Sequence, residues 1–374
     1  MLKRKLYKKW TFFFLSIFIF VTASVVAINY AVDPMWCFNH ETPFAEWREF
    51  IDERIQKANL LRFRKDEIDT LIIGSSRVMQ MDTNKIGDGA FNFGLSSCMP
   101  IEYSVLMEIF HETRGYYPDK IIVGLDFFGA NATYNDGSKE NRAVPILQML
   151  DDNAFIYRME MLSSIELSRK SFNLIRKNIS IKEDDIEYAD IRYNVGHMGA
   201  SAVYPPIEDV EHKKHIVHNL YIEFKKIYEF FRYNEQYKKN ISALLQLSSQ
   251  VDVKPYITPE GTLTMRIIAE TPGRIDDYER MLRDAVDVFG GVWNFMYVNS
   301  VTSNHIYWRE PSHCLKQVNS WILDRMSGNG NPPTDFGVYV TKENIDEHIK
   351  EVRAQLLALP SQKDSWTELM GEYN

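Results

Sequence analysis

The 374-residue sequence is poor in cysteine and, beyond its N-terminus, in positive charge, and it has no tandem repeat or low-complexity tract. None of its three cysteines, Cys37, Cys98 and Cys314, belongs to a motif for a cysteine nucleophile or a cysteine-rich metal site. The first nine residues hold five of the 43 Lys and Arg, so the rest of the chain carries a net charge of about −13. This balance argues against nucleic acid as a partner. It also repels a strongly anionic polymer on average, although a local groove can differ from the mean.

The N-terminal segment has no charged residue over residues 10–32, which is long enough to cross a bilayer that needs about 20 apolar residues. Five basic residues precede it: Lys3, Arg4, Lys5, Lys8 and Lys9. Because positive flanks stay in the cytoplasm, the pattern predicts a single-pass signal anchor in the inner membrane, with everything after Asp33 outside, in the periplasm if the cell is Gram-negative. The alternative is a signal peptide cleaved after Val25-x-Ala27, but the apolar stretch is longer than a usual signal-peptide core.

The rest of the chain alternates strand-like and helix-like segments, as a parallel α/β sheet requires. The expected strands are residues 69–73, 90–93, 120–125, 251–257 and 292–297, and the expected helices are residues 46–65, 101–113, 275–289, 312–326 and 343–359. Together they predict a flavodoxin-like three-layer sandwich at residues 66–326. A cytoplasmic tail (1–9), the membrane span (10–32) and a juxtamembrane linker and helix (33–65) precede it, and a linker and C-terminal helix (327–374) follow it.

One segment, residues 138–214, breaks the alternation and is expected to be a helical insertion. It contains an acidic patch at residues 183–185 and a stretch rich in glycine and proline at residues 196–206. Two interpretations stay open: the insertion is a lid over a functional site, or it is ordinary helical packing.

Three motifs with chemically useful residues follow one another along the chain. The first is an apolar run that ends in Gly74-Ser75-Ser76, which places Ser76 at the carboxyl edge of the expected sheet, where open α/β folds bind ligands. The second is Phe91-Asn92-Phe93-Gly94-Leu95-Ser96-Ser97, and the third is Tyr307-Trp308-Arg309-Glu310-Pro311-Ser312-His313. Each has a simpler interpretation, because serines after glycine commonly cap helices and a histidine after Pro-Ser can do the same.

In this order the motifs resemble those of the SGNH/GDSL hydrolase-like superfamily, and within it the membrane-anchored proteins similar to those that O-acetylate alginate and other exopolysaccharides. The resemblance spans residues 66–326, and the segment at residues 29–34 is similar to the juxtamembrane Asp-Pro segment of the same proteins. It implies that Ser76 is a nucleophile, that His313 and Glu310 complete a triad, and that Gly94 contributes to an oxyanion hole.

Several residues depart from the family pattern. Glu310 stands where the family usually has aspartate, and its longer arm changes the geometry although it can still accept the Nδ1 proton of the histidine. Ser75 stands in place of another usual aspartate. The oxyanion-hole asparagine has no clear counterpart: Asn131 is the nearest candidate, and its other interpretation is a turn residue beside a glycine.

The proposed chemistry explains why these residue types are needed together. A serine hydroxyl is a poor nucleophile until an imidazole accepts its proton, and the imidazole needs a partner that fixes its tautomer and stabilises its charged form. The tetrahedral intermediate needs N–H donors, which the backbone at Ser76 and Gly94 could supply. Other histidines compete for the role of base: His111, His197, His212, His215, His218 and His305. His215 and His218 have a spacing that suits a metal, but lysines surround them and no cysteine or carboxylate pattern completes a site, so no metal or cofactor is expected.

The resemblance implies transfer of an acyl group, usually acetyl, to a polysaccharide or glycan hydroxyl outside the cytoplasm. Because acetyl-CoA is cytoplasmic, it also implies a multi-spanning membrane acyltransferase partner that brings acyl groups across. Two alternatives stay open: a carbohydrate esterase with the same triad, and a non-catalytic protein that binds polysaccharide or assembly partners. Cys98 and Cys314 follow the second and third motifs closely, so they could form a disulfide or remain two buried thiols.

Overall fold

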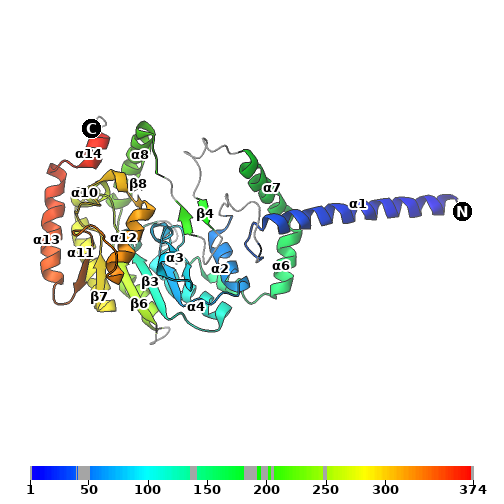
Figure 1. Cartoon of the computed structure of the whole chain (residues 1–374), viewed down its shortest axis with the longest axis horizontal. Helices are drawn as coiled ribbons and strands as arrows, with labels where there is room; N and C mark the ends of the chain where they lie inside the picture. Colours follow the sequence, from blue (N-terminus) through cyan, green and yellow to red (C-terminus); the bar gives the residue numbers. More distant parts are fainter. Residues whose placement is uncertain are drawn as a thin grey trace.

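A six-stranded sheet forms the centre of the domain (Figure 1). The computed structural model describes residues 2–38, 40, 51–134, 141–180, 192–194, 201–203, 206–246 and 251–371. Five strands are parallel, namely β1 (Thr70–Ile73), β2 (Ala90–Asn92), β3 (Lys120–Leu125), β6 (Asp252–Ile257) and β7 (Gly291–Asn294), while β10 (Val338–Thr341) is antiparallel to β7. The order across the sheet is β10-β7-β6-β3-β1-β2. The chain is therefore an α/β protein with a mostly parallel sheet.

The central strands β1 and β3 are short apolar runs that are buried on both faces of the sheet, as is typical of parallel sheets. Leu71 and Ile73 of β1 belong to one buried apolar cluster and Ile72 to another, because successive side chains of a strand point to opposite faces. The first cluster includes side chains of α4 (Tyr103–Arg114), α9 (Tyr237–Gln246), α11 (Arg274–Phe289) and α13 (Ile345–Ala358), and the second includes side chains of α12 (Lys316–Ser327) and α14 (Ser365–Met370).

The other described elements connect or flank this core. The remaining helices are α1 (Leu2–Val32), α2 (Glu53–Phe63), α3 (Thr83–Ile86), α5 (Val144–Met149), α6 (Ala154–Ser163), α7 (Ile165–Ser180), α8 (Val210–Glu229) and α10 (Thr262–Glu270). Short 3₁₀ helices are η1 (Ser76–Val78), η2 (Pro100–Glu102), η3 (Phe127–Ala130), η6 (His305–Tyr307) and η7 (Leu359–Ser361). Two small antiparallel pairs are β4 (Arg192–Asn194) with β5 (Ser201–Val203), and β8 (Trp308–Glu310) with β9 (His313–Cys314).

The five expected strands are confirmed, but the C-terminal third differs from the sequence-based expectation in two places. The helix predicted at residues 312–326 begins only at Lys316, because residues 308–314 form the β8–β9 hairpin. The region expected to be a linker after residue 326 contains β10, which joins the edge of the main sheet. Of the predicted insertion, residues 183–185 and most of residues 196–206 lie outside the described residues.

Helix α1 projects from the domain (Figure 1) and is the part of the described chain that could span a membrane. Its segment Tyr7–Val32 has a mean hydropathy of 2.5, and its length and composition are sufficient for a span. Beyond it, Asp33 adopts a positive φ of 46° and its carboxylate accepts the N–H groups of Cys37 (2.8 Å) and Phe38 (3.0 Å). These bonds fold the chain back toward the domain.

Candidate active site

Ser76 lies in the turn that follows β1, and the local backbone requires the preceding glycine. Gly74 has φ +151°, and a Cβ there would lie 2.7 Å from Cγ1 of Val78. The neighbouring Ser75 is the helix-capping residue, because its hydroxyl accepts the Arg77 N–H at 3.2 Å at the start of η1. The capping role that could have explained either serine thus belongs to Ser75.

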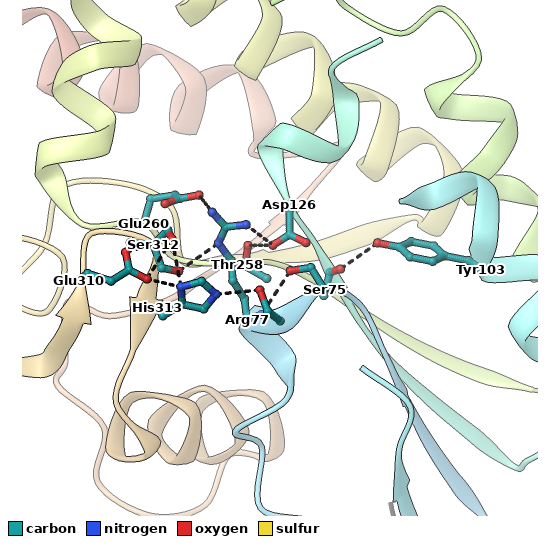
Figure 2. A network of polar contacts seen from close by, with 11 residues as sticks. Ser75, Arg77, Tyr103, Asp126, Thr258, Glu260, Glu310, Ser312 and His313 are labelled. Atoms are coloured by element: carbon teal, nitrogen blue, oxygen red, sulfur yellow. Dashed lines mark hydrogen bonds and ion pairs between the residues drawn. The ribbon is translucent and has the colours of Figure 1, made fainter. Parts of the chain in front are cut away.

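The structure brings Ser76, His313 and Glu310 together, although Ser76 and His313 lie 237 positions apart in the sequence. Figure 2 shows His313 beside Glu310. Ser76 Oγ lies 2.7 Å from Nε2 of His313, and Nδ1 of the same ring contacts Oε1 of Glu310. The β8–β9 hairpin carries both partners, and its turn residue Ser312 donates its N–H to Oε2 of Glu310 at 2.8 Å. The three side chains therefore lie in the order that a serine nucleophile, its base and an orienting carboxylate would require.

The carboxylate of Glu310 is buried, with 6% of the residue exposed, and it remains the charged member of the pair. Burial alone would raise the pKa of Glu310, but His313 and the hydrogen bonds from His313 and Ser312 hold that pKa below its ordinary value. An ionised carboxylate on Nδ1 keeps the proton on that nitrogen. Nε2 is then left as an acceptor toward Ser76.

Arg77, which the sequence analysis did not single out, joins the candidate site to three strands of the sheet (Figure 2). Its guanidinium lies 2.5 Å from Glu260 after β6 and 3.4 Å from Asp126 after β3, and it donates to the carbonyl of Ser312 at 3.1 Å. Thr258 donates its hydroxyl to the same Asp126 oxygen at 2.6 Å. The network links the carboxyl ends of β1, β3 and β6 to the hairpin that carries His313.

The charges in this network shift each other's protonation. Burial would lower the pKa of Arg77, but Glu260 and Asp126 raise it above its ordinary value. Burial raises the pKa of Glu260 to about 8, with Arg77 opposing that shift and the carboxylates of Asp126 and Glu310 adding to it. No sequence motif marks Arg77, because its partners come from three segments that are distant along the chain.

The backbone donors near Ser76 differ from those expected. The Gly94 N–H donates to Oδ1 of Asn92 at 2.9 Å, so this donor is already occupied. Ser97, three residues further, lines the same cavity as Ser76 and has a positive φ of 50°, which is uncommon for a residue other than glycine. The N–H groups of Ser76 and Ser97 donate to no acceptor in the described part of the chain. Of the two, Ser97 rather than Gly94 therefore has an N–H available to an acceptor, and its place in the second motif was the only signal for it in the sequence.

Buried charges hold the loop that carries Gly94 and Ser97. The Lys57 ammonium donates to the carbonyl of Gly94 at 2.5 Å, and burial lowers the pKa of Lys57 to about 8. Arg142 contacts the carbonyl of Ser97 and pairs with Glu102 at 2.9 Å. The carbonyl of Ser96, which shares its peptide bond with the Ser97 N–H, accepts from the guanidinium of Arg54 at 3.3 Å. Because the C=O and N–H of a trans peptide point in opposite directions, the Ser97 N–H points away from Arg54.

Asn131 has a structural role in this conformation. Its Oδ1 accepts hydrogen bonds from the Thr133 N–H (2.9 Å), the Thr133 hydroxyl (2.8 Å) and the Arg232 N–H (3.1 Å). It is not among the described residues that line the cavity at Ser76. This is the turn interpretation that was the alternative to an oxyanion role.

The candidate triad opens onto a cavity of about 170 Å³ whose wall is largely apolar. Helix α8 contributes Leu220, Phe224 and Ile227, which share one face of the helix, and Phe128 and Tyr134 contribute aromatic rings. Helix α8 overlaps the segment expected to be an insertion (residues 138–214) only in its first turn, and its later residues, beyond that segment, cover one side of the site.

Lys213 ties α8 to the hairpin of the triad. Its buried ammonium donates to the carbonyls of Trp308 (2.7 Å) and His305 (2.9 Å). Burial lowers the pKa of Lys213 to about 8, and the nearby carboxylate of Glu310 opposes that shift. Lys213 therefore links the helix that forms the wall of the cavity to the hairpin that carries His313 and Glu310.

The cysteines and the other histidines take no part in the triad. All three cysteines are free and buried, and burial raises the pKa of Cys314 to about 12 and that of Cys98 well above its ordinary value. Among the described residues no group of His, Cys, Asp and Glu side chains could hold a metal ion. His215 contacts Asn219 on the same helix instead.

Comparisons with protein-family models, with curated proteins and with solved structures found no match for this chain. The resemblance to the SGNH/GDSL superfamily therefore depends on the three motifs and on the geometry described above.

Proposed function

We propose that this chain is an SGNH-type acyl-transfer enzyme that acts outside the cytoplasm, with Ser76 as nucleophile, His313 as base and Glu310 as the orienting carboxylate. The single observation that supports it most is the 2.7 Å contact between Ser76 Oγ and Nε2 of a histidine whose Nδ1 contacts a buried carboxylate. A serine that only caps a helix has no need of such a histidine, and Ser75 already fills that role.

The strand order supports the proposed fold family. The five parallel strands, numbered by their order along the chain, lie in the order 2-1-3-4-5, which is the flavodoxin-like arrangement. Ser76 follows the first of them, at the carboxyl end where ligands bind in such sheets. A flavodoxin-like three-layer sandwich is the architecture that the SGNH resemblance implies.

The proposed reaction has two halves. In the first, Ser76 Oγ attacks the carbonyl carbon of an acyl donor, its proton passes to Nε2 of His313, and the donor leaves with that proton. In the second, a glycan hydroxyl gives its proton to Nε2 and attacks the acyl carbon, the bond between that carbon and Ser76 Oγ breaks, and His313 returns the proton to Oγ, which regenerates the free serine. The backbone N–H groups of Ser76 and Ser97 are the proposed donors to the oxyanion in both halves, and each such donor contributes about 3 kcal/mol of barrier lowering in serine hydrolases.

The apolar wall favours acyl transfer over simple hydrolysis. Leu220, Phe224 and Phe128 border the triad and restrict the space beside it, so that an acceptor hydroxyl that fills the cavity competes well with water. The acyl donor would come from a multi-spanning membrane acyltransferase, and α1 would keep both proteins in one membrane. The same triad acting on water is the esterase alternative.

The test is intact-mass analysis of the full chain in detergent micelles after incubation with p-nitrophenyl acetate. We expect one acetyl adduct, located at Ser76 by peptide mapping and absent from the Ser76→Ala and His313→Ala variants. Ser75→Ala is the matched control, because it removes the adjacent hydroxyl and should retain the adduct. No adduct in a chain whose buried cysteines still resist thiol reagents would contradict the proposal and support the non-catalytic alternative.

A further inference from the structure

Helices α6 and α7 carry an unusual concentration of exposed apolar side chains. Of the fifteen large apolar residues beyond Tyr30 that are exposed in the described part of the chain, six lie on these two helices. They are Phe155, Ile156 and Met159 on α6, and Ile165, Phe172 and Ile179 on α7. Soluble proteins rarely leave so much apolar surface in one place without a partner.

The three residues on α7 form one continuous stripe. They are seven residues apart, and seven residues are close to two full turns of helix, so Ile165 (79% exposed), Phe172 (61%) and Ile179 (77%) lie along one line. The opposite side of the helix holds the buried Leu167 and Leu174. Helix α7 is thus apolar on two sides: one packs into the protein and the other faces outward.

The stripe lies beside positive charge in a domain that is otherwise acidic. Arg169 and Arg176 are exposed and also seven residues apart, so they run parallel to the stripe, and Lys170 and Lys177 lie next to them. With one acidic residue, Glu166, the helix has a net charge of +3, whereas the chain as a whole has −8. An exposed apolar line edged with arginine is the pattern of a helix that lies in the interface of a membrane with anionic lipids.

The position of the two helices fits this interpretation. They lie against the part of α1 that joins the domain (Figure 1). The buried side chain of Asn29 donates to the carbonyls of Leu162 (3.0 Å) and Ser164 (2.9 Å) between the helices, and Ser171 of α7 donates its hydroxyl to Asn29 at 3.1 Å. A span of about 20 residues that starts at Trp10 ends at Asn29, so the hydrogen bonds of Asn29 lie where the hydrocarbon core of the membrane would end.

We propose that α6 and α7 lie on the outer surface of the membrane that α1 spans, with Ile165, Phe172 and Ile179 in the lipid and Arg169 and Arg176 on anionic headgroups. The partner of this surface is a lipid bilayer. The contact adds a second attachment to the single helix and fixes the domain in one orientation against the membrane. This surface is separate from the candidate triad, so the proposal does not depend on the enzyme assignment.

The experiment uses the full chain in lipid nanodiscs, with single cysteines introduced for a nitroxide spin label. Phe172→Cys reports on the stripe, and Leu357→Cys is the matched control, because Leu357 is 62% exposed and belongs to α13, which lies at the opposite end of the domain from α1 (Figure 1). Since Cys37, Cys98 and Cys314 are buried, a folded variant takes up one label per chain, which checks folding. We expect the label at Phe172 to collide several-fold more often with oxygen than with a water-soluble nickel complex, and the label at Leu357 to show the reverse.

A change of lipid composition tests the proposed contact of Arg169 and Arg176 with anionic headgroups. In nanodiscs that contain phosphatidylglycerol, the label at Phe172 should be better protected from the nickel complex than in pure phosphatidylcholine. An Arg169→Gln, Arg176→Gln double variant should lose that difference, whereas the control Arg280→Gln, Arg283→Gln on α11 should keep it. Equal exposure of the two labels to the nickel complex in both lipids would overturn the proposal and leave a protein partner as the explanation of the stripe.

Discussion

The amino and carboxyl edges of the central sheet differ: the larger cavity lies at one edge, and the side chains that could carry out a reaction lie at the other. The larger hollow, of about 840 Å³, lies at the amino edge, where β1, β2 and β3 begin, and acidic residues such as Asp66, Asp88 and Asp119 line it. The cavity at the carboxyl edge has only about 170 Å³. Within the described part of the chain, the lining of the larger hollow has no serine, cysteine or histidine, whereas the smaller cavity contains Ser76, His313 and Glu310 in mutual contact.

The comparison teaches that paired functional groups, and not volume, mark the candidate site. Charged side chains occur at both edges, but those at the carboxyl edge have partners on several strands: Arg77 alone joins Asp126 and Glu260. At the amino edge, Asp88 and Asp119 are exposed to solvent. Fixed, buried charges can orient a reacting group, whereas solvated carboxylates adjust freely and bring little preorganisation.

The largest expected effect comes from breaking the contact between Ser76 and His313. Ser76→Ala or His313→Ala should reduce the rate of p-nitrophenol release by up to roughly 10⁶-fold, because each removes a member of a unit that works only when complete. Stopped-flow release of p-nitrophenol measures the rate. At the amino edge, Asp88→Asn and Asp119→Asn should leave it unchanged. A loss in those variants instead would reverse the assignment of the two edges.

Removing the carboxylate of Glu310 should be less severe than removing the base. Glu310→Ala leaves His313 able to accept a proton but without the partner that fixes its tautomer, so a loss of roughly 10⁴-fold is expected. The same assay measures it, with Glu310→Gln as the isosteric variant that keeps the hairpin packed. A loss at Glu310 as large as that at His313 would contradict these roles.

A substitution of Arg77 tests whether its ion pairs with Asp126 and Glu260 also stabilise the fold. Arg77→Gln leaves Asp126 and Glu260 buried without their cation, which should lower the free energy of unfolding by about 3–5 kcal/mol, as measured by urea titration in detergent. The exposed pair of Arg280 and Glu235 is the matched comparison, since Arg280→Gln should cost less than about 1 kcal/mol. Similar costs for both variants would mean that solvent screens the network.

The parts that could be predicted from the sequence are those that local pattern determines. The strand that ends at Ile73 is a buried apolar run closed by a glycine, so both its position and the exit of Ser76 follow from a few adjacent residues. The same holds for α1, whose uncharged length is visible directly. Ser76, Glu310 and His313 could be predicted because each belongs to a short motif, although the serine and the histidine lie 237 positions apart and nothing in the sequence between them indicates a contact.

The parts that could not be predicted depend on tertiary contacts. Ser312 and His313 resemble the start of a helix, but the pairing of Trp308 with Cys314 turns residues 308–314 into a hairpin. Gly94 was a reasonable oxyanion donor until the Asn92 side chain was seen to occupy its N–H. Arg77 has no motif, because a buried cation is defined by partners that arrive from other strands.

A second histidine at the carboxyl edge gives the smallest expected effect and sharpens the contrast with His313. His348 is buried on α13, where Nδ2 of Asn294, the last residue of β7, donates to its Nε2 at 2.9 Å. Burial lowers the pKa of His348 to about 4, so the ring stays neutral in the folded chain while the unfolded chain binds a proton near the ordinary value of 6.5. Because the unfolded state binds more protons between these values, the free energy of unfolding should fall as the pH drops from 6.5 to 4, by at most about 1.4 kcal/mol for each pH unit.

Urea titrations at several pH values measure this dependence. The free energy of unfolding should change less steeply with pH for His348→Gln than for the parent chain, with the more exposed His111→Gln as control. An unchanged slope would mean that His348 is accessible to protons in the folded state.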